Sequence, residues 1–264
     1  MIFRVPTNYE EFTLVVPVKT EKPERIHIIL KDESLPNTVY TDRSRVITGT
    51  DVFYIRVPVS GKSALLLVYN DRIGNVPKAG DSTFQVNEKD IKKIPLEKKL
   101  DAIDVSNPDI QSWIRFCTKF CFNAGHLTSG NYQSKDGKFL IEYLPVITSS
   151  NTGKELNTPA RISKTSGRIQ VAQKKFVPMT FPMRMVIMMH EFSHYYANDD
   201  INNESEADLN ALMIYLGLGY PRIEAHEAFL KTFIGCDTPE NAARYDLIQK
   251  FIRDFENNKV ILYE

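Results

Sequence analysis

The sequence predicts an α+β protein in two parts: an N-terminal antiparallel β-sandwich or β-barrel domain over residues 1–98, and an α+β domain over residues 99–264. Three observations predict it. Short runs of β-branched and aromatic residues, separated by turn residues, fill the first part. After Asn107 the apolar period becomes that of helices. A chain of 264 residues, 42% hydrophobic and 25% charged, is long enough for two domains of ordinary globular composition.

The first part is expected to consist of short strands. Pro, Asn, Asp and Gly separate six apolar runs of strand length, and closely spaced strands of this kind are typical of an antiparallel sandwich or barrel. Nothing in this part assembles a catalytic set of side chains. The expected strands are FTLVVPV, RIHIIL, RVITG, VFYIRVPV, SALLLVY and STFQV, at residues 12–18, 25–30, 45–49, 52–59, 63–69 and 82–86.

The second part mixes helices and strands. Asn107 followed by Pro108 is a favourable helix start, and the apolar residues that follow share one helical face. The segments KFLIEYLPVI and RIQVAQKKF predict two strands. Gly217, Gly219 and Pro221 interrupt the helical pattern further on. The remaining predicted helices cover residues 182–197, 204–216, 221–233 and 238–256.

The composition excludes a strongly basic nucleic-acid-binding protein. The 33 Lys and Arg residues balance 33 Asp and Glu residues, so no nucleic-acid partner is expected. The longest apolar runs, ALLLVY and MVIMM, are far too short to cross a bilayer, so no membrane partner is expected either. The start of the chain has no signal-peptide pattern, and three cysteines fit a reduced compartment. Together these features predict a cytoplasmic protein.

A histidine pair on a predicted helix indicates a metal site. Residues 190–194 form the pattern HExxH, with His190 and His194 four apart and therefore on one helical face. Two imidazoles so placed can hold one tetrahedral ion. Glu191 lies about 100° around the helix from His190 and can reach a water on the ion without binding the ion. The alternative is a surface helix with two histidines on its polar face.

A catalytic zinc needs a third protein ligand, and the sequence offers competing carboxylates. Asp200 lies six residues after His194, but a ligand there requires a sharp turn for which glycine is suited, and Ala197 stands at that position. Glu204 and Asp208 are four apart, so a helix puts both on one face. Glu204 can then bind the ion while Asp208 hydrogen-bonds a liganding histidine. Glu204 is favoured over Asp200, and Glu206 is a weaker third candidate.

HExxH followed by NESEAD on a second helix resembles the gluzincin metallopeptidases, over roughly residues 135–217. The resemblance implies a zincin-like domain and the hydrolysis of peptide bonds, with zinc as cofactor and a peptide or protein as substrate. It implies His190, His194 and Glu204 as zinc ligands, Glu191 as general base and Asp208 as the acid that supports a histidine. Only nine residues separate the second histidine from the third ligand, a short connection that suits a minimal domain.

The same resemblance implies an edge strand that binds the substrate backbone by β-addition. RIQVAQ, residues 168–173, is the expected strand, with a plain structural strand as the equal alternative. Tyr220 and His226 are possible donors to the oxyanion of the reaction, although solvent exposure of His226 is favoured. Cys117 and Cys121 are expected to be small buried hydrophobic residues, because no second cysteine pair follows at metal-binding spacing.

A rival interpretation comes from another class of protein. A zincin-like domain can persist in a structural or assembly protein, for example a neck or tail component of a tailed-phage virion, where the ion is structural or vestigial. The compact β domain and the lack of a secretion signal or obvious propeptide permit this interpretation, which implies a virion location and a homo-oligomer or virion assembly as partner. A weaker third interpretation is a regulatory protease whose β domain recognises the protein to be cut.

Overall fold

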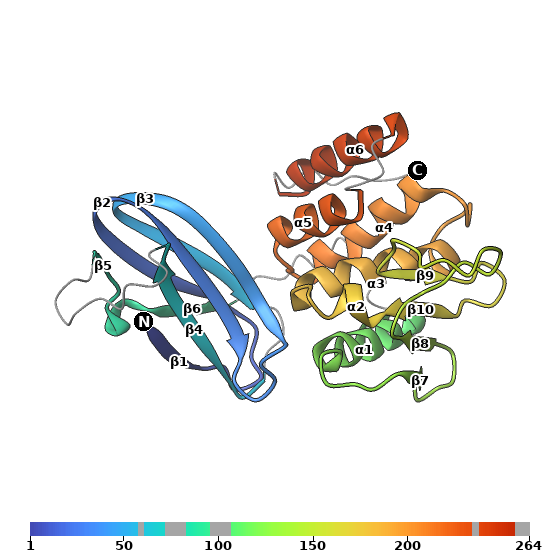
Figure 1. Ribbon diagram of the computed structural model, residues 1–264, viewed down its shortest axis with the longest axis horizontal. Coiled ribbons are helices and arrows are strands. Elements are labelled where there is room, and N and C mark those ends of the chain that lie inside the picture. The colour runs from blue at the N-terminus through green and yellow to red at the C-terminus, as the bar shows by residue number, and fades with distance from the viewer. Residues whose placement is uncertain (58–60, 72–82, 96–106, 234–237, 257–264) are drawn as a thin grey trace. The chain divides into compact units, whose positions relative to one another are not determined.

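The computed structural model describes residues 1–57, 61–71, 83–95, 107–233 and 238–256 (Figure 1). The chain is a mixed α+β protein and forms two compact units, Met1–Glu97 and Lys98–Glu264. The predicted boundary between residues 98 and 99 lies in a segment outside the described residues. Each unit is described by itself.

The described strands of the first unit form one antiparallel sheet. Its order is β1-β4-β2-β3, and β5 and β6 also pair with β2. The single short helix described in this unit is the 3-10 turn η1, Glu88–Asp90. The strands are β1 (Ile2–Pro6), β2 (Phe12–Asp32), β3 (Val39–Val57), β4 (Ser63–Asn70), β5 (Phe84–Gln85) and β6 (Lys92–Pro95).

The sequence predicted too many breaks in this unit. The runs at 12–18 and 25–30 form one continuous strand, β2, and β3 likewise spans the expected break between 49 and 52. The turn-like Pro23 does not end β2, because the register between β2 and β3 shifts between Thr20 and Glu24. Proline lacks an N–H group, so it is tolerated where the ladder is irregular.

The second unit contains a four-stranded sheet and six helices among the described residues. The sheet has the order β7-β8-β10-β9, in which β10 pairs parallel with β8 and antiparallel with β9. Every predicted helix is present. The elements are α1 (Pro108–Asn123), β7 (Gly130–Gln133), β8 (Leu140–Leu144), β9 (Ala160–Ile162), β10 (Ile169–Ala172), α2 (Gln173–Phe176), α3 (Phe181–Tyr196), α4 (Glu204–Gly217), α5 (Arg222–Phe233) and α6 (Pro239–Glu256).

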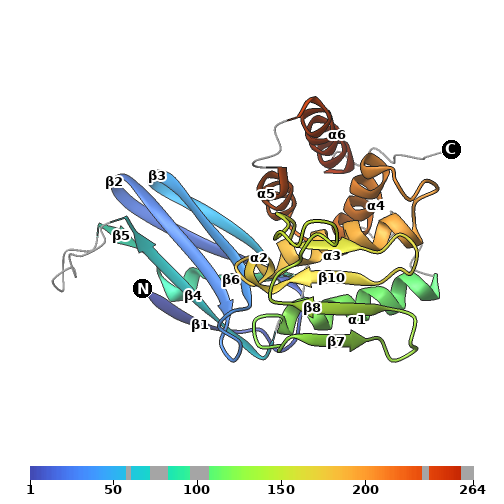
Figure 2. The same ribbon diagram turned by 45° about the vertical axis from the view of Figure 1, so that its right-hand side comes forward.

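The core of the second unit lies around α3. Figure 2 shows α3 between α1 on one side and α4 and α5 on the other. The fully buried Trp113 of α1 stacks on Phe192 of α3 with ring centroids 5.0 Å apart. Cys117 and Cys121 are buried in the same core, with their Sγ atoms 3.7 Å apart, as expected for packing residues. Burial raises the pKa of Cys117 well above its usual value. Cys236 lies outside the described residues.

Helix α3 is fixed at its N-terminal end by polar contacts. The side chain of Thr180 accepts a hydrogen bond from the backbone N–H of Met183, which caps the helix. The side chain of Arg184 is fully buried and donates to the carbonyl oxygens of Cys121, Phe176 and Val177. A buried guanidinium needs such acceptors, and these three join α3 to α1 and to the end of α2. The helix that bears the HExxH pattern is therefore held rigidly.

The start of α4 is also set locally. Asn203 caps the helix by accepting a hydrogen bond from the backbone N–H of Glu206. Glu204 is consequently the first residue of the helix, and Asp208 lies one turn later on the same face. Within the described residues, no helix is both long and apolar enough to span a membrane.

Candidate metal centre

Three side chains from α3 and α4 converge on one point. The Nε2 atoms of His190 and His194 face each other at 3.1 Å. The Oε2 atom of Glu204 lies 3.4 Å from Nε2 of His190, and its Oε1 atom lies 3.5 Å from Nε2 of His194. Among the described residues these three form the group of potential metal ligands. The expected ligands are therefore brought together.

The spacing of these atoms fits one tetrahedral ion. Ligands about 2.0–2.1 Å from a tetrahedral zinc ion are about 3.3 Å from one another. The 3.1 Å between the two imidazole nitrogens is close to that value, and each of these nitrogens lies 3.4 or 3.5 Å from a different oxygen of the Glu204 carboxylate. Two imidazole nitrogens and one carboxylate oxygen also match the donors that zinc accepts in catalytic sites. The three side chains could therefore hold a metal ion.

The remaining nitrogen of each imidazole lies close to an oxygen atom, as an ion-pair contact for His190 and as a hydrogen bond for His194. Nδ1 of His190 lies 2.9 Å from Oδ1 of Asp208, whose side chain is 1% exposed. Nδ1 of His194 lies 3.0 Å from the backbone oxygen of Ile201. An acceptor at Nδ1 favours the tautomer that leaves the Nε2 lone pair free for a metal. Asp208 therefore lies where the sequence predicted the supporting carboxylate.

A further charged residue beside the site, Arg244 of α6, was not predicted from the sequence. Its Nε and one terminal nitrogen lie 2.8 and 3.0 Å from the two carboxylate oxygens of Asp208. The same terminal nitrogen lies 3.3 Å from Oε2 of Glu204. A two-pronged pair of this kind fixes the orientation of a carboxylate. Arg244 thus joins α6 to the metal-binding face of α4, a long-range contact that no local spacing predicts.

The charges of the site shift its pKa values. Burial lowers the pKa of His190, but contacts with Asp208 and Glu204 outweigh burial and raise that pKa to about 10. The hydrogen bonds to His190 and His194 lower the pKa of Glu204. Without a metal the site therefore stabilises a protonated imidazole beside an ionised carboxylate, so that a proton occupies the place of the cation.

The other two candidate ligands point elsewhere. Oδ1 of Asp200 accepts the backbone N–H of Asn202, and the carboxylate of Glu206 accepts the backbone N–H groups of Asp199 and Asp200. Neither residue is among the described residues that line the cleft at the metal centre. Both acids instead stabilise the loop between α3 and α4.

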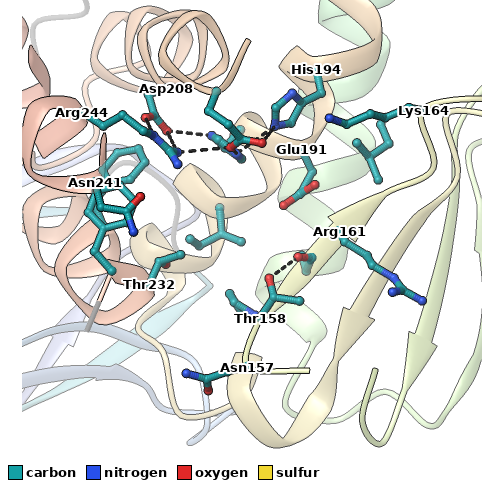
Figure 3. A pocket seen from close by; sticks show the side chains of 18 residues that line it. Asn157, Thr158, Arg161, Lys164, Glu191, His194, Asp208, Thr232, Asn241 and Arg244 are labelled. Atoms are coloured by element: carbon teal, nitrogen blue, oxygen red, sulfur yellow. Dashed lines mark hydrogen bonds and ion pairs between the residues drawn. The ribbon is translucent and has the colours of Figure 1, made fainter. Parts of the chain in front are cut away.

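Glu191 faces the same cleft but lies apart from the three ligand atoms, as the HExxH pattern predicts. Its side chain is 9% exposed, and its carboxylate accepts a hydrogen bond from the backbone N–H of Ile162 in β9. Burial raises the pKa of Glu191. Figure 3 shows Glu191 and His194 pointing into one space, with Asp208 and Arg244 together at its far side. A carboxylate in this position is suited to exchanging protons with a ligand of the ion.

The cleft beside the metal centre has a volume of about 360 Å³. One wall is the segment 157–162 together with Lys164, and the opposite wall comes from α5 and α6. This volume lies within the range of small-molecule and peptide sites. The residues that line it on the helical side are Phe229, Thr232, Phe233, Asn241 and Arg244.

The prediction of RIQVAQ as the edge strand was wrong. Its central part is β10, which is covered by β8 on one side and β9 on the other. The strand at the edge beside the cleft is β9, and three residues were too short a run to be recognised as a strand in the sequence. The backbone N–H groups of Ser163 and Ala172 donate to the carbonyl oxygens of Arg168 and Pro159 at the two ends of the pairing between β9 and β10. By the alternation of an antiparallel ladder, Ala160 and Ile162 direct their backbone groups away from β10.

The structure places Tyr220 and His226 elsewhere. Tyr220 is buried and stacks on Tyr215 with centroids 4.9 Å apart. The ring of His226 is half-buried and approaches the ring of Tyr245 edge-on at 6.2 Å. Neither residue is among the described residues that line the cleft. The suggestion that one of them donates to the oxyanion was therefore wrong.

No protein-family model, no curated protein and no solved structure matches the chain. Its function is therefore inferred from the geometry of the metal centre and the cleft.

Proposed function

We propose that the chain is a zinc-dependent peptidase. The observation that supports the proposal most directly is the convergence of His190, His194 and Glu204 at tetrahedral spacing, next to a buried glutamate and an open cleft. A structural zinc site is usually closed by four protein ligands, whereas a catalytic site has three and an open position. Three ligands facing a cleft favour the catalytic kind.

The second unit is proposed to have a zincin-like arrangement. Support comes from the order of its parts: a mixed sheet with a short edge strand, a helix with two histidines, and a second helix with the third ligand. The edge strand β9 lies beside the cleft, and the outward N–H of Ala160 and carbonyl of Ile162 are suited to pair with an extended peptide, whereas the Ala160 carbonyl accepts from the Thr158 hydroxyl and the Ile162 N–H donates to Glu191. We therefore propose that β9, and not the expected strand at residues 168–173, pairs with the substrate backbone.

Each side chain has a proposed part in the reaction. A bound zinc ion supplies a Lewis acid for the scissile carbonyl and lowers the pKa of bound water towards about 7. Glu191 takes a proton from the attacking water and delivers it to the leaving amine. Asp208 holds the His190 ring in the ligating tautomer, and Arg244 holds Asp208. Asn241 lines the same cleft.

The test is the substitution Glu191→Gln in the zinc-loaded full chain. The expected result is retained zinc with peptide cleavage reduced by a factor of at least about 10³, since the amide cannot accept the proton. A matched control is Glu206→Gln, a glutamate outside the cleft, which should retain both zinc and activity. Cleavage is measured by mass spectrometry on a diverse peptide mixture. Full activity of Glu191→Gln would contradict the proposed role of Glu191.

The rival function, a structural or assembly protein of a phage virion, gives a different outcome. Zinc would be bound at one ion per chain, no peptide of the mixture would be cut, and gel filtration would show a defined ring or other assembly. That combination would replace the enzymatic proposal by the structural one.

A further inference from the structure

A second cavity of about 230 Å³ adjoins the cleft at the metal centre. Asn157, Pro159 and Thr232 line both spaces and form their common border. Figure 3 shows Asn157 and Thr158 at the end of the cleft away from His194 and Asp208. The far walls of the second cavity come from α2, from the turn after it and from α5. The residues there are Lys175, Pro178, Met179 and Lys231.

Two lysines line this second cavity, Lys175 and Lys231, and they differ in whether a carboxylate neutralises the positive charge. Nζ of Lys231 lies 2.9 Å from a carboxylate oxygen of Glu227, which neutralises it. Nζ of Lys175 instead donates to the amide oxygen of Asn157 at 2.6 Å. Among the described residues no carboxylate lies within ion-pair distance of Lys175. An ammonium group has three donors, and the partner of Lys175 is a neutral amide. The charge of Lys175 is therefore not neutralised by this contact, and two of its donors remain for a ligand.

The position of Lys175 relative to the edge strand suits a bound peptide. Asn157 precedes β9 by three residues, and Ile162 at the other end of β9 touches Glu191. An extended chain advances about 3.4 Å per residue, so a peptide alongside this segment reaches Asn157 about four to five residues from Glu191. A side chain of that peptide, or its terminal group, can then enter the second cavity.

We propose that Lys175 makes the second cavity a subsite for an acidic group of the substrate. The group is an Asp or Glu side chain, or a terminal carboxylate, within about five residues of the bond to be cut. The inference rests on the proposed peptidase function for its biological meaning, but the binding preference itself can be measured without cleavage. Apolar contact from Pro178 and Met179 suits the methylene groups of such a side chain.

The experiment is selective retention of a degenerate hexapeptide pool on immobilised, zinc-loaded full-length protein with Glu191→Gln. This protein is compared with three double variants, which carry Lys175→Gln, Lys175→Glu or Lys174→Gln in addition to Glu191→Gln. Lys174 is the matched control: it is the adjacent lysine, pairs with Glu155 and lines neither cavity. Retained peptides are sequenced by mass spectrometry, in blocked and free-terminus pools, to distinguish a side chain from a terminal carboxylate.

The expected result is enrichment of acidic groups by about threefold to tenfold, the range for one partly desolvated ion pair. Lys175→Gln should abolish the enrichment, Lys175→Glu should reverse it towards Lys and Arg, and Lys174→Gln should leave it unchanged. Absence of acidic enrichment, or enrichment unaffected by both changes at Lys175, would overturn the inference. A separate digestion by the zinc-loaded wild-type protein tests the peptidase proposal, so the two can fail independently.

Discussion

The contact between Asp208 and His190 gives the sharpest prediction about the metal centre. Asp208 is 1% exposed, and its two oxygens serve Nδ1 of His190 at 2.9 Å and the guanidinium of Arg244 at 2.8 and 3.0 Å. The substitution Asp208→Asn keeps the size of the side chain and removes its charge. The amide oxygen can still accept, but the NH₂ group that replaces the second oxygen is a donor and cannot accept from Arg244.

The magnitude follows from two separate losses. Removing a carboxylate that orients a liganding histidine typically lowers metal affinity 10- to 100-fold, or about 1.4–2.7 kcal/mol. Arg244 is 16% exposed, so it is left with a poorly compensated charge. Breaking one side of such a buried pair costs about 3–5 kcal/mol, and an isosteric amide should cost somewhat less, about 2–3 kcal/mol. Both zinc affinity and the stability of the metal-free protein should therefore fall.

The assay uses competition with a chromogenic chelator for affinity and urea unfolding for stability. Trp113 is the one tryptophan of the sequence and is fully buried in the second unit, so its fluorescence reports the unfolding of that unit. Asp199→Asn, which removes a carboxylate from the exposed α3–α4 loop, is the control and should change neither quantity. A loss of stability with zinc affinity unchanged within about twofold would show that Asp208 supports the fold and not the metal ligand.

Three further predictions concern the ligands, the protons and the core. Glu204→Ala should lower zinc affinity at least about 100-fold by removing one of three ligands, whereas Asp200→Asn should leave it unchanged; equal losses in isothermal titration would reopen the choice of third ligand. Because the raised pKa of His190, about 10, keeps it protonated near neutrality, this group stabilises the metal-free fold below about pH 6.5 and that contribution is lost as the pH rises towards about 10. Zinc must displace this proton, so titrations at about pH 8 in buffers of different ionisation enthalpy should show release of about one proton or more, and none would contradict the protonated site. Arg184→Met should destabilise the second unit by about 3–5 kcal/mol by leaving buried carbonyls unpaired, whereas Arg168→Met, at an exposed arginine, should cost less than about 1 kcal/mol; similar values in urea unfolding would contradict the assigned role of Arg184.

Local patterns in the sequence were sufficient to predict the helices and the three side chains that converge. The spacing of His190 and His194 and of Glu204 and Asp208 is set by the geometry of a helix turn, which depends only on neighbouring residues. The helix start at Asn107 is local for the same reason. These features need no knowledge of the rest of the chain.

The features that the sequence did not predict all depend on distant partners. The edge strand β9 has three residues, and its identity as an edge is set by pairing with β10. Arg244 reaches Asp208 across 36 positions of the chain. The continuity of β2 through Pro23 depends on how the ladder with β3 tolerates a register shift. Pairing and register are non-local, so composition and periodicity alone could not supply them.

The most direct test of the metal centre is zinc X-ray absorption on the purified full-length protein, together with metal analysis. One zinc ion per chain with nitrogen and oxygen ligands at about 2.0–2.1 Å, lost in Glu204→Ala, is the expected result. A shell of sulfur atoms at about 2.3 Å, or no stoichiometric zinc in protein whose three ligands are intact, would contradict the assignment of His190, His194 and Glu204 as the metal site.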